Sequence, residues 1–151
     1  MLRVKIYAEL IGKKYNYKNI RIKSLMDNKI VHIHIGYANN NIDTSLKLVK
    51  YLDLYLGVPS VLKDKDKRRR SLYGKAGCFR LTSYGVEYRV LSSKLMEDVS
   101  SLEFVWNQVI KAISAYNDCR DLSDSFNVID AINNSNTELA KHLINEYNLI
   151  D

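Results

Sequence analysis

The sequence predicts an α+β fold in which a small, mainly antiparallel sheet of three to five strands carries helices on one face. Two segments predict the sheet, because apolar and ionisable residues alternate along residues 30–37 and along the segment that contains Glu87. Three later segments with apolar residues at helical spacing predict the helices. With 151 residues and a single proline, the chain can bury one core, and we expect a single domain over residues 1–151.

Strands are expected in the amino-terminal part. Residues 2–10 alternate between apolar and polar side chains, which favours a first strand or the start of a helix. Residues 19–25 and 29–37 flank a short polar pair, a pattern typical of a hairpin. In the second strand of this hairpin, His32 and His34 share one face and the apolar residues share the other.

A helix is expected after the histidine strand. Asn41 or Asp43 can cap it, and apolar residues at helical spacing continue to about Leu56. Gly57 followed by Pro59 is expected to end this helix.

The carboxy-terminal third is expected to be helical. Ser100 opens a capping-box signature that leads into a long apolar stripe containing Trp106. A short helix is expected over residues 124–133, and Ser135 opens the last helix in a second signature of the same kind. We expect the stripes to form the core and His142 to lie on the surface.

Charge and composition limit the function classes. The chain has 23 Lys and Arg against 17 Asp and Glu, a formal charge of +6, which favours anionic partners such as nucleotides, nucleic acid or acidic peptides. Residues 63–70 include six cations and are expected in a surface loop or exposed helical turn. No apolar run approaches the ~20 residues of a membrane span, and the start lacks a secretory signal. We therefore expect a cytoplasmic protein with no membrane contact and with Cys78 and Cys119 reduced.

Two strand faces form the candidate site. His32 and His34 can hold a divalent metal or donate to a phosphate, although the same pattern also occurs on solvated sheet faces. Glu87 and Arg89 lie on one face of the other strand, as a surface ion pair or as part of a site.

The setting of Glu87 favours a site. Gly74, Lys75, Gly77 and Arg80 precede it, so that backbone amides and cations can meet an anion close to a carboxylate able to hold Mg²⁺. Phosphoryl transfer needs a metal-binding carboxylate, cations and close approach of the backbone.

Several sequence blocks resemble a known family in the family's order. The blocks are His32-Ile-His-Ile-Gly-Tyr37, Leu54-Tyr-Leu-Gly-Val-Pro-Ser60, Arg69-Arg-Ser-Leu-Tyr-Gly-Lys-Ala-Gly77, Tyr84-Gly-Val-Glu-Tyr-Arg-Val-Leu-Ser92, Ala131-Ile-Asn-Asn134 and Glu138-Leu-Ala-Lys141. Through them, residues 30–151 resemble the carboxy-terminal half of the phage-encoded amidoligases, which are ATP-dependent carboxylate-amine ligases with a glutamine-synthetase-like fold. Residues 1–29 form an amino-terminal segment with no such match.

The resemblance implies a reaction through an acyl phosphate: ATP phosphorylates a carboxylate, and an amine then displaces the phosphate. It implies ATP and Mg²⁺ as cofactors. The implied catalytic residues are Arg89 and Lys75. Glu87 and His32 would hold the metal. The implied nucleotide-binding residues are His32, His34, Arg70, Gly74 and Gly77.

One feature of the family is missing from this sequence. Relatives carry a Glu-x-Glu strand that supplies further metal-binding carboxylates, and no Glu-x-Glu occurs here. A two-metal phosphoryl site needs several carboxylates. We therefore expect a truncated or split ligase of phage origin, inactive alone in the cytoplasm of an infected bacterial cell. A second polypeptide or a homo-oligomer would complete the sheet.

A non-catalytic function is the alternative. A phage protein could reuse the fold to bind and inhibit a host nucleic-acid-handling or defence complex, either a protein or a ribonucleoprotein. The partner-binding residues would then be Lys67, Arg68, Arg69 and Arg70, because clustered cations attract nucleic acid.

Overall fold

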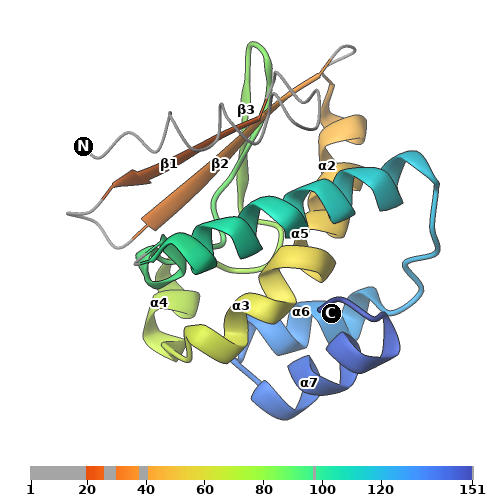
Figure 1. The fold of residues 1–151 in the computed structure, drawn as a ribbon. Helices are drawn as coiled ribbons and strands as arrows, with labels where there is room; N and C mark the ends of the chain where they lie inside the picture. Colours follow the sequence, from red (N-terminus) through yellow and green to blue (C-terminus); the bar gives the residue numbers. More distant parts are fainter. Residues whose placement is uncertain (1–19, 26–29, 38–40, 97, 151) are drawn as a thin grey trace.

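Figure 1 shows the fold of a computed structural model, which describes residues 20–25, 30–37, 41–96 and 98–150. The strand or helix expected over residues 2–10 lies outside the described residues. The elements in chain order are β1 (Ile20–Leu25), β2 (Ile30–Gly36), α2 (Ile42–Leu52), η2 (Asp53–Gly57), α3 (Val58–Lys63), α4 (Lys67–Leu72), β3 (Phe79–Thr82), β4 (Gly85–Tyr88), η3 (Ser93–Met96), α5 (Val99–Asn117), α6 (Ser125–Asn133) and α7 (Thr137–Glu146). The predicted α+β class is confirmed.

The four strands of the described residues form one antiparallel sheet in the order β1-β2-β4-β3. Strands β1 and β2 confirm the predicted hairpin. Strands β3 and β4 form a second hairpin, which joins the first through the pairing of β2 with β4. This pairing sets His34 opposite Glu87 and Ile33 opposite Tyr88. The sheet therefore has one ionisable face and one apolar face, since successive side chains along a strand alternate.

A glycine fixes the close approach of the two hairpins. Gly85 begins β4 with a φ of +151°, and a Cβ there would lie 2.0 Å from the carbonyl oxygen of Ile35. Any side chain at this position would push β4 away from β2. Glycine therefore supports the register that sets His34 against Glu87.

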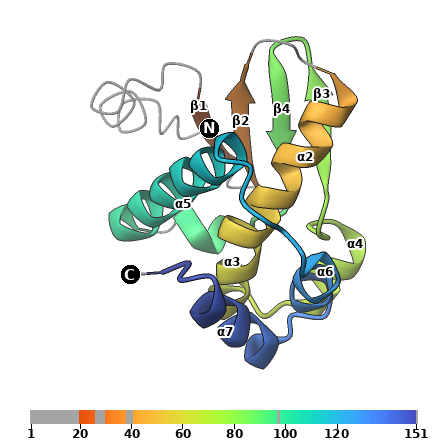
Figure 2. The same cartoon turned by 90° about the vertical axis from the view of Figure 1, so that its right-hand side faces the viewer.

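Helices cover the apolar face of the sheet. Ile33, Ile35, Val86 and Tyr88 are buried there, and each such side chain contributes roughly 1.5–3 kcal/mol by leaving water. Figure 2 shows α2 running across β4 and β3, with the other helices on the same side of the sheet. This arrangement confirms the expectation of helices on one face.

The helical stretch after β2 is longer than predicted. Asn41 caps α2 as expected, because its side chain accepts the N–H of Thr44 at 2.9 Å. The predicted end at Gly57 is wrong, since the chain remains helical through η2 and α3 to Lys63. Pro59 is tolerated because it lies in the first turn of α3, where a missing N–H is least costly. The element η2 is a π-helix, a rare form that often marks functional sites.

The three carboxy-terminal helices are confirmed, with small changes at their caps. Asp98 caps α5 instead of Ser100, accepting the N–H of Ser101 at 2.7 Å. Asn136 caps α7 instead of Ser135. Trp106 is buried, as predicted. No helix within the described ranges is both long and apolar enough to cross a membrane.

Candidate functional site

Glu87 lies at the centre of the ionisable face. Its strand, β4, is flanked by β2 and β3, and the residues directly opposite Glu87 are His34 and Arg80. The two strands that carry the predicted site residues are therefore neighbours, which confirms the expected pairing. Side chains from three strands meet at one carboxylate.

Four side chains surround the Glu87 carboxylate. His32 Nδ1 lies 3.2 Å from Oε1, and His34 Nδ1 lies 4.0 Å from Oε2. Arg89 Nε lies 3.4 Å from Oε1, and the Arg80 guanidinium donates a short hydrogen bond to Oε2. Each carboxylate oxygen thus faces one histidine and one arginine. We call these five residues the Glu87 cluster.

Burial and charge act in opposite directions on Glu87. The residue is fully buried, whereas the Arg80 and Arg89 side chains are 63% and 39% exposed. Burial by itself raises the pKa of Glu87, but the hydrogen bond from Arg80 and the charges of His32, Arg80 and His34 lower it below the usual value. Glu87 is therefore an ionised carboxylate. The ionisable face is not open at Glu87, because the neighbouring side chains cover the carboxylate.

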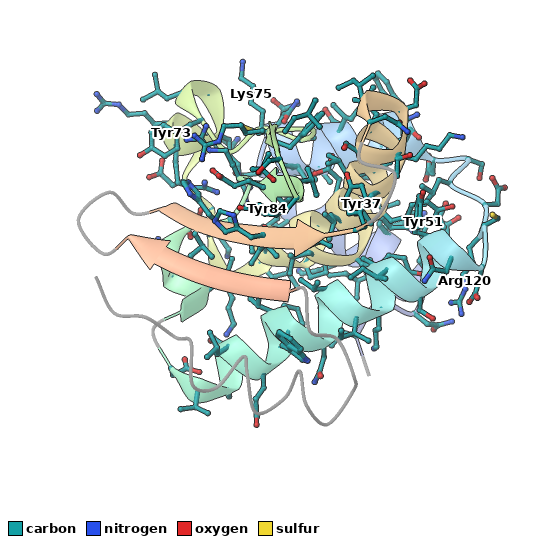
Figure 3. The ribbon with its side chains drawn as sticks, turned by 90° about the horizontal axis from the view of Figure 1, so that it is seen from above. Tyr37, Tyr51, Tyr73, Lys75, Tyr84 and Arg120 are labelled. Carbon is teal, nitrogen blue, oxygen red and sulfur yellow. The ribbon has the colours of Figure 1, made fainter. Side chains whose placement is uncertain are left out.

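Two members of the site were not predicted as such. Tyr84 lies in the β3–β4 turn, and its hydroxyl makes a short hydrogen bond with His34 Nδ1; Figure 3 shows Tyr84 beside β2. Arg80 was noted only as a nearby cation, and its register opposite Glu87 was not predicted. The sequence feature that could have placed both residues is the alternation of apolar and polar side chains over residues 79–88 around a polar turn, because this pattern predicts a hairpin.

The cluster contains a set of metal-ligand atoms. His32, His34 and Glu87 each offer one ligand atom, all within 4.8 Å of one another, and this is the one such group among the described residues. Two imidazoles and a carboxylate suit a transition-metal ion. Mg²⁺ prefers oxygen ligands and is often bound by one or two carboxylates together with substrate phosphates. Glu87 therefore fits Mg²⁺ as a single protein ligand whose other ligands would be phosphate and water.

The glycine loop does not offer the predicted open cradle of amides. The N–H of Ala76 donates to Asn133 Oδ1 at 2.8 Å, and the N–H of Gly77 donates to Asp53 Oδ2 at 2.7 Å. Gly74 and Gly77 both have positive φ, +85° and +74°, which explains glycine at these positions. The Gly77 amide donates to a protein acceptor, so in this structure it does not point at a nucleotide site. These glycines shape the loop.

Arg69 and Arg70 are buried, which corrects the expectation of an exposed basic run over residues 63–70. Arg69 Nε donates to Asp64 at 2.6 Å, and both guanidinium groups donate to the carbonyl of Val90 at 3.0–3.1 Å. Arg70 also donates to the carbonyl of Gly74 at 3.1 Å. Burial and the charge of Arg69 lower the pKa of Arg70 to about 10. Both arginines hold α4 against the end of β4, and neither is exposed for a nucleotide or a partner.

Lys75, Lys67 and Arg68 remain exposed. Lys75 projects outward from the molecule in Figure 3. Its carbonyl accepts the N–H of Cys78, and the carbonyl of Cys78 accepts the N–H of Arg89 at 2.9 Å. The loop that carries Lys75 is thus tied by backbone hydrogen bonds to the strand end that carries Arg89. Lys67 and Arg68 are what remains of the predicted basic patch on α4.

A second buried carboxylate, which was not predicted, lies on the other side of β4. Asp53 Oδ1 accepts the Tyr88 hydroxyl at 2.8 Å, and Oδ2 accepts the Gly77 N–H. Burial raises the pKa of Asp53 to about 7, although these hydrogen bonds and Arg70 lower it in part. Asp53 joins η2, β4 and the glycine loop.

Comparison with known proteins identifies a family. The family model described as phage phiEco32-like COOH.NH2 ligase-type 2 matches residues 30–148. No curated protein and no solved structure matches the chain. The matched region runs from β2 to beyond α7 and includes all five residues of the Glu87 cluster.

Proposed function

The chain belongs to the phage phiEco32-like COOH.NH2 ligase-type 2 family, and we propose that it forms the anion-binding part of an ATP-dependent carboxylate-amine ligase. The observation that carries this proposal is the convergence of Arg80, Arg89 and two histidines on the buried Glu87. One carboxylate balances only one of the two guanidinium charges. The surplus positive charge suits reactants with negative charge, such as a nucleotide and a carboxylate.

The chemistry of this reaction class defines what the site must do. A carboxylate oxygen attacks the γ-phosphorus of ATP, and the bond to the ADP oxygen breaks. The amine nitrogen then attacks the carbonyl carbon of the acyl phosphate, phosphate leaves, and the nitrogen loses a proton to give the amide. Negative charge on the phosphoryl oxygens needs fixed cations in the first step. We assign this role to Arg89 and Arg80, with Lys75 attracting the same anion from the tethered loop.

A divalent ion would be held by Glu87 and His32, with His34 as a third ligand, and when bound it would neutralise phosphate charge. The two imidazoles favour Mn²⁺ over Mg²⁺ in this set of ligands. Tyr84 supports this arrangement, because its contact with His34 Nδ1 fixes the orientation of that ring.

The site needs further carboxylates for full turnover. Within the described residues, Glu87 is the one carboxylate of the metal-ligand group, whereas two-metal phosphoryl transfer uses several. Strand β3 is an edge of the described sheet, and an edge strand offers unpaired backbone groups to another chain. We propose that a second polypeptide, or another copy of this chain, supplies the missing ligands.

Thermal unfolding with ATP tests the proposal. ATP with Mn²⁺ or Mg²⁺ should raise the melting temperature, because a ligand that binds only the folded state stabilises it. Arg89→Met should reduce this rise. His142→Ala is the matched control, since His142 is exposed, as predicted, and its Nε2 lies 3.6 Å from the Glu146 carboxylate on the same helix. No rise with ATP and either ion would contradict the proposal.

The alternative function, binding of a host complex through the basic residues of α4, has fewer exposed cations available than the sequence predicts. Lys67 and Arg68 are exposed on α4, whereas Arg69 and Arg70 are buried. If Lys67→Gln with Arg68→Gln abolished binding to a host ribonucleoprotein, and Arg89→Met did not, the alternative would be favoured.

A further inference from the structure

A cavity lies on the helix side of β4, opposite the Glu87 cluster. It encloses about 170 Å³ and is bordered by α2, η2, the glycine loop and α6. Lys50 and Asp124 line it, and Asp53 contributes a buried carboxylate to its wall. Most of the lining is apolar and comes from Leu46, Val49, Leu54, Leu122, Val128 and Ile129.

Apolar surface continues from this cavity over α6. Phe126 is 80% exposed, the highest fraction among the large hydrophobic side chains of the described residues. Ile129, one turn further along α6, lines the cavity and is itself about half exposed. Leu46 on α2 is also exposed at the cavity edge. Contiguous exposed apolar surface of this kind marks an interaction site.

We propose that this groove is an interface between two copies of the chain, in which Phe126 of each copy enters the cavity of the other. Phe126 does not line the cavity of its own copy. An apolar cavity of roughly 150 Å³ accommodates a benzene ring, so a volume of about 170 Å³ accommodates the phenyl group of Phe126. Aromatic side chains are enriched at the centres of protein interfaces.

Charge complementarity favours a second copy as the occupant. Lys50 lies on the α2 rim and Asp124 on the α6 rim of the groove. A two-fold axis along the groove sets α2 of one copy opposite α6 of the other, so each lysine meets an aspartate of the partner copy. The same surface is thus complementary to itself in charge.

This interface is independent of the proposed ligase function. It lies on the opposite side of the sheet from Glu87, and no residue of the sheet lines it, so loss of this interface leaves both the Glu87 cluster and the β3 edge in place. Failure of one proposal is therefore distinguishable from failure of the other, because ATP binding and oligomeric state are measured separately.

Sedimentation equilibrium of the full chain over a wide concentration range tests the interface. The wild-type chain should dimerise, and Phe126→Ser should raise the dimer dissociation constant about tenfold or more, since truncating a central aromatic residue removes a large share of binding energy. Leu72→Ser is the matched control, because Leu72 on α4 is 67% exposed and lies outside the groove. It should leave the dissociation constant unchanged.

A charge exchange tests the orientation of the two copies. Lys50→Asp should weaken the dimer, and adding Asp124→Lys should restore it, because the pair is re-formed with opposite signs. Unchanged melting temperatures would show that the variants fold. A wild-type chain that stays monomeric at its highest concentration, or a dimer that survives Phe126→Ser, would overturn the proposal.

Discussion

Glu87 and Asp53 are two buried carboxylates on opposite sides of the same strand. Glu87 faces the guanidinium groups of Arg80 and Arg89, and its pKa lies below the usual value. Asp53 accepts hydrogen bonds from Tyr88 and Gly77, which are neutral, and burial raises its pKa to about 7. Burial is common to both residues, so the charge of the neighbours decides whether each carboxylate is ionised.

The difference separates a binding surface from a structural network. Arg80 and Arg89 are partly exposed, so they can turn from Glu87 toward an incoming anion. Tyr88 and Gly77 are held by the fold, and Tyr88 is fully buried. The Asp53 network therefore fixes the glycine loop and β4, while the Glu87 cluster remains able to exchange partners.

The largest expected effect is a pH dependence of stability that comes from Asp53. Its pKa is 3.8 when unfolded and about 7 when folded, so the folded state binds the proton more tightly. The resulting stabilisation is fully present below about pH 4 and is lost as the pH rises through about 7. The difference between these two pKa values corresponds to roughly 4 kcal/mol of stability.

Urea unfolding of the wild type and Asp53→Asn from pH 4 to pH 8 measures this effect. The asparagine variant should lack the decline in stability over this range, and Glu87→Gln should retain it. Equal pH slopes for the wild type and Asp53→Asn would show that Asp53 is ionised in the folded state, as Glu87 is, and would contradict this prediction.

The next largest effect is expected from Arg70→Ala. The substitution leaves the carbonyl groups of Gly74 and Val90 without one of their donors and creates a cavity in a fully buried position. We expect the free energy of unfolding to fall by about 3 kcal/mol. Chemical denaturation measures this free energy. If Arg70→Ala lowered it less than Arg80→Ala does, the structural role assigned to Arg70 would be contradicted.

A smaller effect on stability is expected from Arg80→Ala, because Arg80 is mostly exposed and Glu87 keeps Arg89 and His32 as partners. The loss should be about 1 kcal/mol. The affinity of this variant for ATP, measured by titration calorimetry, should nevertheless fall. If Arg80→Ala lowered stability but left ATP affinity unchanged, Arg80 would have a structural role and no role in binding.

The smallest effect is expected from Tyr84→Phe. The change removes one hydroxyl, which contacts His34 at a half-exposed turn, and should cost no more than about 1 kcal/mol. Binding of Mn²⁺, measured by calorimetry, should weaken because the His34 ring loses its orienting partner. Unchanged Mn²⁺ affinity would remove Tyr84 from the site.

The sheet and much of the Glu87 cluster could be predicted from sequence because they depend on local alternation. His32, His34 and Glu87 each lie on a strand whose period assigns them to one face, and Arg89 follows directly after β4. The pairing of these strands followed from their common apolar face. The β3–β4 hairpin was missed, and with it the position of Arg80 opposite Glu87.

Burial of charge could not be predicted from sequence. Arg69 and Arg70 lie in a basic run, yet they are buried because Asp64 and the carbonyl of Val90, some twenty residues further on, accept their hydrogen bonds. No local pattern reports such a distant acceptor. Asp53 was missed for the same reason, since its partners Gly77 and Tyr88 are remote in the chain.

Calorimetric titration of ATP with Mn²⁺ tests most directly whether the Glu87 cluster, and not the Asp53 network, binds the anionic reactants. The wild type and Asp53→Asn should bind with similar affinity, whereas the double variant Arg80→Ala, Arg89→Ala should lose at least about tenfold, as expected for loss of charge-assisted contacts. Equal affinity in the double variant, or no binding by the folded wild-type chain, would contradict the account.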